Sequence, residues 1–341
     1  MFSAYRMISP RRYRERFGLD FEDFAVGQRF RHRPGITFSQ QENVSESLDT
    51  FNGAMLHYDA HYAAQTGWGK PLMVSTLTLQ RAIGMTSKTF GRRKAIPRFD
   101  EILMTGPVFG GDTLYSESEV LSVAEGDADA GLVMVKTRVV KPDGAEIARM
   151  TWRAAIFRRG RGPMAGEGEP VTDARFAAYH EGADGFLVEQ AGMFFDDFAA
   201  GDGFIHYPHR RFSTVDTDRY ARQALELSPH AYGMADAEGG TVAETFLIGA
   251  ATALTTRTFG RVVANLGWFD VEAPRPVRDG DTVEAESEVT DARASRSREG
   301  EGILAVNTRL YNQRRELVLS FGRKLLVYRR SEQKRYAAAG Y

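Results

Sequence analysis

A histidine and an amide lie near each other in the stretch DTFNGAMLHYDAHYAAQTGWGKPLMVSTLTL, from Asp49 to Leu79. His57, one of seven histidines in the chain, follows Asn52 by five residues. A histidine has a pKa of about 6.5 and can exchange a proton at neutral pH, whereas an amide can only orient a water molecule. His61 lies one helical turn from His57, which would suit a metal, but no third ligand follows at a convincing spacing. The pattern favours acid–base chemistry without a metal. The alternative is that His57 is an ordinary loop histidine.

The elements around this stretch are predicted by capping and periodicity. Ser39 and Glu42 form a capping-box pattern, so we expect a helix to begin there. The run LMVSTLTLQRAIGMTSKTF from Leu72 to Phe90 is apolar on all sides and indicates a second, buried helix. The segments that follow alternate apolar and polar residues and predict antiparallel strands, with a hairpin turn at Lys141–Gly144. His57 is therefore expected in a loop between two helices.

The chain repeats itself once, with landmarks in the same order at offsets of 169 to 174 positions. Because the order of predicted elements is also shared, each half is expected to contain one strand, two helices and about four strands, an α+β arrangement. The matched pairs include FEDFAVG at Phe21–Gly27 with FDDFAAG at Phe195–Gly201, KTFGR at Lys88–Arg92 with RTFGR at Arg257–Arg261, and GDTLYSESEV at Gly111–Val120 with GDTVEAESEV at Gly280–Val289.

The repeat divides the chain into three regions. We expect an N-terminal repeat at residues 1–157, a linker rich in Gly, Pro, Ala and charge at residues 158–190, and a C-terminal repeat at residues 191–341.

Composition narrows the class of protein. Hydrophobic residues make up 43% and charged residues 26%, and the formal net charge is −1, so no strong field attracts nucleic acid or an anionic membrane. The chain has no cysteine, which excludes disulfides and thiolate chemistry. No apolar run approaches the ~18 residues of a membrane span, and the basic start lacks the apolar core of a secretory signal. We expect a cytoplasmic protein without a membrane or nucleic-acid partner.

The string Asn52-Gly53-Ala54-Met55-Leu56-His57-Tyr58-Asp59 resembles the Asp-x-Asn-Pro-Leu-His-x-Asp signature of the MaoC-like (R)-specific enoyl-CoA hydratases, which have the hotdog fold. Leu72–Thr76 aligns with the family's glycine turn at the start of the central helix, and PVFGGDTL at Pro107–Leu114 is similar to its Gly-Asp-Thr strand. The resemblance covers nearly the whole chain. It implies a tandem (double) hotdog, each half a long helix wrapped by an antiparallel sheet.

The sequence departs from the family pattern at several positions. Asn52 stands at the catalytic aspartate, Ala54-Met55 replaces Asn-Pro, and Ser75 stands at the oxyanion glycine. An asparagine before the histidine and the ANLGW string at Ala264–Trp268 resemble the double-hotdog branch that includes mesaconyl-CoA hydratase (β-methylmalyl-CoA dehydratase). The aligned string of the second half, Glu226–His230, has lost the amide–histidine spacing, so that half is expected to be degenerate.

The resemblance implies three catalytic roles in the first half. His57 would move the proton of a water molecule, Asn52 would orient that water, and the Ser75 N–H at the start of a helix would bind the thioester oxyanion. Asp59 or Asp49 is an alternative second acid–base group, because an asparagine cannot exchange a proton.

Cations and an aromatic residue near the central helix are candidates for substrate binding. Arg81, Arg92 and Arg93 could bind the phosphates or carboxylate of an acyl-CoA, and Trp68 could line an acyl pocket, although each could equally be structural. No cofactor is expected beyond the coenzyme A of the substrate.

Three functions remain open at this point. The first is reversible hydration of a short branched or dicarboxylic enoyl-CoA, with mesaconyl-CoA/β-methylmalyl-CoA as the leading candidate. The second is an acyl-CoA thioesterase, and the third is an inactive acyl-CoA-binding protein. Two repeats already supply the pseudo-dimer that a hotdog needs, so a monomer is possible, and a homodimer is our expectation.

Overall fold

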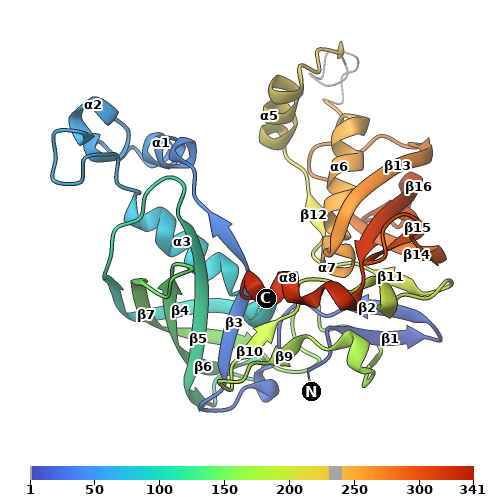
Figure 1. Ribbon diagram of the computed structural model, residues 1–341, viewed down its shortest axis with the longest axis horizontal. Helices are drawn as coiled ribbons and strands as arrows, with labels where there is room; N and C mark the ends of the chain where they lie inside the picture. The colour runs from blue at the N-terminus through green and yellow to red at the C-terminus, as the bar shows by residue number, and fades with distance from the viewer. Residues whose placement is uncertain (1, 230–239) are drawn as a thin grey trace. The chain divides into compact units, whose positions relative to one another are not determined.

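The computed structural model describes residues 2–229 and 240–341, and its chain forms two compact units (Figure 1). The first-repeat unit contains Phe17–Ala165, Ala178–Gln190 and Gly340–Tyr341. The second-repeat unit contains Met1–Arg16, Gly166–Ala177 and Ala191–Ala339. No helix in the described part of the chain is long and apolar enough to cross a membrane.

The first-repeat unit is an antiparallel-rich sheet with a helix against it. Its seven strands are ordered β4-β7-β6-β5-β3-β10-β9. Its elements are η1 (Phe21–Asp23), β3 (Arg29–Thr37), α1 (Gln40–Asp49), η2 (Met55–His57), α2 (Ala60–Ala63), α3 (Ser75–Met85), α4 (Ser87–Phe90), β4 (Arg93–Met104), β5 (Thr113–Ala124), β6 (Ala130–Val140), β7 (Glu146–Phe157), β9 (Tyr179–Glu181) and β10 (Leu187–Glu189).

The second-repeat unit follows the same plan. Its nine-stranded sheet has the path β13-β16-β15-β14-β11-β2-β1-β8, with β12 paired to β14. Its elements are β1 (Tyr5–Ser9), β2 (Arg12–Glu15), β8 (Glu169–Pro170), η3 (Ala174–Phe176), η4 (Phe195–Asp197), β11 (Gly203–Ile205), β12 (Arg210–Arg211), α5 (Thr214–Ala224), α6 (Glu244–Leu254), α7 (Thr256–Phe259), β13 (Val262–Glu272), β14 (Thr282–Ala294), β15 (Glu301–Asn312), β16 (Leu317–Tyr328), η6 (Arg330–Glu332) and α8 (Gln333–Ala338).

The predicted α+β class and tandem hotdog plan are confirmed, and local sequence signals explain several boundaries. The Ser39 side chain accepts a hydrogen bond from the Glu42 amide while the Glu42 carboxylate accepts one from the Ser39 amide, so the predicted capping box starts α1. At the predicted hairpin turn, Gly144 has a φ of 86°, a conformation that glycine adopts at little cost.

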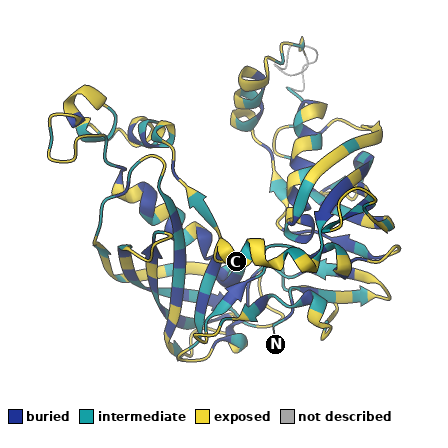
Figure 2. Ribbon diagram, in the orientation of Figure 1, coloured by how far each residue is buried: buried dark blue, intermediate teal, exposed yellow. Residues whose placement is uncertain are grey.

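Each unit buries the inner face of its sheet against its central helix, as the alternation of buried and exposed positions along the strands shows (Figure 2). The two cores repeat the same aromatic contacts. The rings of Phe24 and Phe90 stack with centroids 5.2 Å apart in the first, and those of Phe198 and Phe259 with centroids 5.1 Å apart in the second.

Two hairpins belong to a different unit from the one that their sequence position suggests. β1 and β2, at the start of the predicted N-terminal repeat at residues 1–157, extend the second-repeat sheet, where β2 pairs in parallel with β11. β9 and β10, within the predicted linker at residues 158–190, extend the first-repeat sheet through a parallel pairing of β10 with β3. The sequence-based boundaries therefore differ from the compact units, because spacing along a chain does not reveal which sheet a hairpin joins.

Each exchanged hairpin ends in a buried glutamate that meets a buried histidine. Glu189 at the end of β10 lies 2.8 Å from Nδ1 of His32 and accepts hydrogen bonds from Thr89 Oγ1 at 2.7 Å and from a backbone amide. Glu15 at the end of β2 lies 2.8 Å from Nδ1 of His206. Since a buried carboxylate is costly unless paired and hydrogen-bonded, these contacts fix both hairpins to their sheets.

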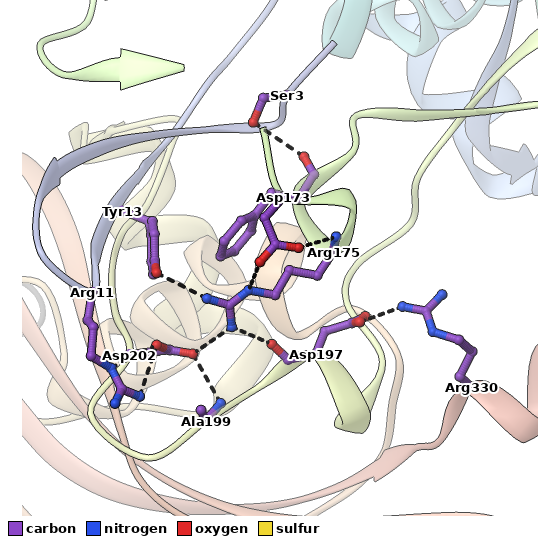
Figure 3. Close-up of polar contacts among 10 residues, drawn as sticks. Ser3, Arg11, Tyr13, Asp173, Arg175, Asp197, Ala199, Asp202 and Arg330 are labelled. Atoms are coloured by element: carbon purple, nitrogen blue, oxygen red, sulfur yellow. Dashed lines mark hydrogen bonds and ion pairs between the residues drawn. The ribbon is translucent and has the colours of Figure 1, made fainter. Parts of the chain in front are cut away.

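The β1–β2 hairpin is also held by a polar cluster around Arg175 (Figure 3). Arg175 donates to the Asp202 carboxylate at 3.0 Å, to the Asp197 carbonyl at 2.9 Å and to the Tyr13 hydroxyl at 3.0 Å. Asp202 also accepts hydrogen bonds from Arg11 of the hairpin. Because Asp202 is buried, its negative carboxylate is balanced by the positive charges of the two arginines.

Candidate functional site

The site begins with the orientation of the His57 ring. Its Nδ1 lies 2.7 Å from the carbonyl oxygen of Leu72. Because a carbonyl oxygen can only accept a hydrogen bond, Nδ1 must carry the proton, and the lone pair of the neutral ring is then on Nε2. His57 is half-buried in η2. The backbone contact therefore gives the ring one basic nitrogen with a defined direction.

The same segment leads into α3. Val74 is the N-cap residue of α3 and Ser75 is its first residue. The first amides of a helix have no partner within the helix, and the helix dipole favours negative charge at this end. The Ser75 amide is therefore available to an oxyanion, three residues beyond the carbonyl that orients His57.

Asn43 of α1 joins these two parts, and sequence analysis missed it. Its side chain is fully buried; Nδ2 donates to the carbonyl oxygens of His57 at 2.8 Å and Leu72 at 3.0 Å. Its Oδ1 accepts a hydrogen bond from the Val74 amide at 2.8 Å. One amide thus connects the histidine loop to the start of α3. An asparagine at a position of α1 that faces the interior was the available signal.

Asn52 and the two alternative acids lie in local turns or caps. The Asn52 Oδ1 accepts a hydrogen bond from the Ala54 amide at 3.0 Å, which closes a turn. No hydrogen bond joins the side chains of Asn52 and His57, both of which lie in the described part of the chain. Asp59 caps α2 through the Tyr62 amide at 2.9 Å, and Asp49 is the exposed last residue of α1.

The three predicted binding arginines have different surroundings. Arg92 is buried, and its guanidinium lies 2.6 Å from the Asp20 carboxylate and donates to the carbonyl oxygen of Pro163 at 2.9 Å. These contacts hold the guanidinium within the fold. Arg81 is more exposed and pairs with Glu42 at 2.7 Å.

Arg93 and Trp68 each lie near an aromatic ring. The Arg93 guanidinium lies 5.7 Å from the centroid of the Trp152 ring, and burial lowers the pKa of Arg93 below its usual value. Trp68 is 47% exposed and its ring centroid lies 6.2 Å from that of Phe109. Binding by these two residues stays a prediction.

The second-repeat unit lacks the corresponding arrangement among its described residues. Thr217 occupies the position of Asn43, and its hydroxyl donates to the Ser213 carbonyl oxygen at 3.0 Å within the same helix. Glu226 accepts a hydrogen bond from the Ser228 amide at 3.0 Å, and His230 of the predicted string lies outside the described residues. The histidine–helix arrangement is thus built from first-repeat residues.

The two repeats match different family models. Residues 22–141 match the MaoC-like domain, which contains the whole histidine–helix site. The first repeat is therefore a MaoC-like domain, within a chain of tandem hotdog architecture. Residues 176–338, which contain the second repeat, match the family model described as mesaconyl-CoA hydratase.

Curated relatives carry names in keeping with this assignment. The chain is 32% identical over 150 residues to mesaconyl-CoA hydratase of Cereibacter sphaeroides, covering 42% of this chain and 43% of that protein. It is 24% identical over 123 residues to β-methylmalyl-CoA dehydratase of Chloroflexus aurantiacus, covering 36% of this chain and 35% of that protein. The match thus spans less than half the length of either relative. A crystal structure of a MaoC domain dehydratase from C. aurantiacus, at 19% identity and a TM-score of 0.40, covers 92% of this chain and 98% of that one.

Proposed function

We propose that this protein reversibly hydrates an α,β-unsaturated acyl-CoA thioester, and that mesaconyl-CoA/β-methylmalyl-CoA or a related short branched enoyl-CoA is its substrate. The observation that carries the proposal is the contact between His57 Nδ1 and the Leu72 carbonyl oxygen. That contact leaves Nε2 as a base close in sequence to the free amides of α3. A thioester hydratase needs both groups.

In the proposed reaction, a water oxygen attacks Cβ while His57 Nε2 accepts its proton. Electron density moves through Cα to the thioester oxygen, where the Ser75 amide and the dipole of α3 stabilise the negative charge. The same imidazolium then returns the proton to Cα, so no net proton is consumed. General acid–base catalysis of this kind contributes about 10²- to 10⁴-fold, and one oxyanion donor contributes about 10²- to 10³-fold.

Asn52 acts as an orienting group in this proposal, because an amide cannot exchange protons. A single base that serves both steps is sufficient, since the proton removed from water is the one returned to Cα. The α3 sequence, Ser75–Met85, contains no aspartate or glutamate, so that helix offers no carboxylate to activate water against the thioester carbonyl.

The experiment is a spectrophotometric assay of the full chain with mesaconyl-CoA and crotonyl-CoA, together with a thiol reagent. Loss of the enoyl-thioester absorbance without release of free CoA is the expected result. Release of free thiol would identify a thioesterase instead. No change with either substrate would contradict the proposal and favour an acyl-CoA-binding protein without activity.

A further inference from the structure

A buried cation without a counter-ion lies in the core of the second-repeat unit. Arg323 of β16 is 3% exposed. Its Nη2 donates to the Thr255 hydroxyl at 2.9 Å, while its buried Nε has no hydrogen-bond partner. Among residues 2–229 and 240–341, no carboxylate forms an ion pair with it. Buried arginines are ordinarily paired, so this one requires an explanation.

The fold itself does not require a cation here, because the first repeat fills the equivalent position with Trp152. The Trp152 indole nitrogen donates to the Thr137 hydroxyl at 2.9 Å, and the side chain is fully buried. The two positions correspond at the same offset that relates Thr137 to Thr308 in the repeat. A guanidinium in place of an indole is therefore a feature particular to the second repeat.

The immediate surroundings offset only part of the cost of burying this charge. Thr255 is the C-cap residue of α6, where the helix dipole favours a cation, and the Phe259 ring lies 5.7 Å from the guanidinium. On β13, Trp268 is the cross-strand partner of Arg323 and is 41% exposed. Arg323 thus lies on the strand next to the edge strand β13, beside an aromatic side chain that solvent reaches.

We propose that Arg323 binds the carboxylate of a small organic acid. A guanidinium presents two parallel N–H donors that match a carboxylate, and Nε is one of them. One carboxylate also balances the single positive charge. A phosphate dianion would leave a net negative charge in the same apolar surroundings, which is costly.

The electrostatics of the site agree with this assignment. Burial lowers the pKa of Arg323 to about 10, and no acid among the described residues offsets this effect. Lys324, the next residue of β16, is exposed and belongs to the opposite face of the strand. Its Nζ lies 5.0 Å from the Phe269 ring. It provides a matched control, because its loss removes a cation from the same strand without touching Arg323.

The test measures binding without catalysis. Excess mesaconate, a free dicarboxylate, is expected to raise the melting temperature of the full-length protein by a few degrees, and inorganic phosphate at equal concentration is expected to raise it less. The rise should disappear in Arg323→Met and in Arg323→Trp, which copies the first repeat, and persist in Lys324→Met. It should also persist in His57→Ala, so a failure of this site is distinguishable from a failure of the proposed hydratase activity.

A structural role for the cation predicts a different pattern. Arg323→Met would then melt at a lower temperature than the wild type, and mesaconate would leave the wild-type melting temperature unchanged. The absence of a mesaconate effect in the wild type overturns the proposal even if the Arg323 variants fail to fold. A larger effect of phosphate than of mesaconate also overturns it.

Discussion

Replacement of Asn43 by alanine tests whether the histidine loop and the start of α3 are positioned by one side chain. The substitution removes hydrogen bonds to the His57 carbonyl, the Leu72 carbonyl and the Val74 amide, at 2.8, 3.0 and 2.8 Å, and a longer one to Gln40 Oε1 at 3.3 Å. The His57 carbonyl keeps the Gln40 side chain and the Leu72 carbonyl keeps the His57 ring, whereas the Val74 amide loses its partner. Each of the two carbonyl bonds contributes about 0.5–1.5 kcal/mol and the unsatisfied Val74 amide costs about 1–3 kcal/mol, so we expect a loss of about 2–6 kcal/mol in the free energy of unfolding.

The positioning role predicts a loss of activity as well. A displaced base or oxyanion donor reduces the rate steeply, so we expect kcat for hydration to fall about 10- to 100-fold while KM changes less than about threefold. Thr217→Ala is the matched control, because Thr217 occupies the same position in the second repeat and its hydroxyl bonds within its own helix. It should lower stability modestly and leave kcat unchanged. A less stable Asn43→Ala with a kcat within twofold of wild type would refute the reasoning, since Asn43 would then be structural.

Three further results are expected. Asn52→Ala should reduce kcat less than His57→Ala does, because Asn52 orients water and does not accept its proton; the reverse order in steady-state kinetics would make Asn52 the principal group. Burial alone would raise the pKa of Glu189, but the charge and hydrogen bond of His32 outweigh this effect and hold the pKa below its usual value of 4.5. The pair therefore stabilises the fold above pH 4.5, and this stability is lost as the pH falls through the lowered pKa. Melting temperatures measured from pH 6 down to about pH 3 should therefore fall less in Glu189→Gln than in wild type, and parallel curves would contradict this role. Arg175→Met should destabilise the protein by about 2–4 kcal/mol in urea unfolding, because it leaves buried Asp202 with one fewer cation; an unchanged midpoint would show that Arg11 suffices.

Sequence analysis predicted the elements of each repeat because their signals are local. The capping box at Ser39 and the Gly144 turn depend on residues a few positions apart, and both are confirmed. The α+β class followed from periodicity that changed from helical to alternating within each half. The internal repeat then predicted that the chain contains two such units.

The exchanged hairpins could not be predicted in the same way. Nothing within the residues of β9 and β10 distinguishes a strand that joins the preceding sheet from one that joins the following sheet. The signal lay in the repeat itself. Glu15 and Glu189 share an offset with His32 and His206, so a long-range pair in one half implies the same pair in the other.

The candidate site was predicted in part. The chemistry of His57 follows from its residue type and the place of Ser75 from the family resemblance, whereas the tautomer of His57 depends on a backbone carbonyl fifteen positions away. Arg92 was a plausible phosphate ligand in sequence, but burial beside Asp20 engages its guanidinium. Burial and partner choice are tertiary properties. For this reason the sequence also gave no indication that Arg323 is buried without a counter-ion among the described residues.

The central claim is that His57 Nε2 carries the proton between water and Cα. The most direct measurement is the rate of mesaconyl-CoA and crotonyl-CoA hydration by His57→Ala, with circular dichroism to show that the variant is folded. We predict a fall in kcat of about 10²- to 10⁴-fold with little change in the melting temperature, because the ring is half-buried in a polar loop. A folded His57→Ala variant that retained near-normal turnover would contradict the account.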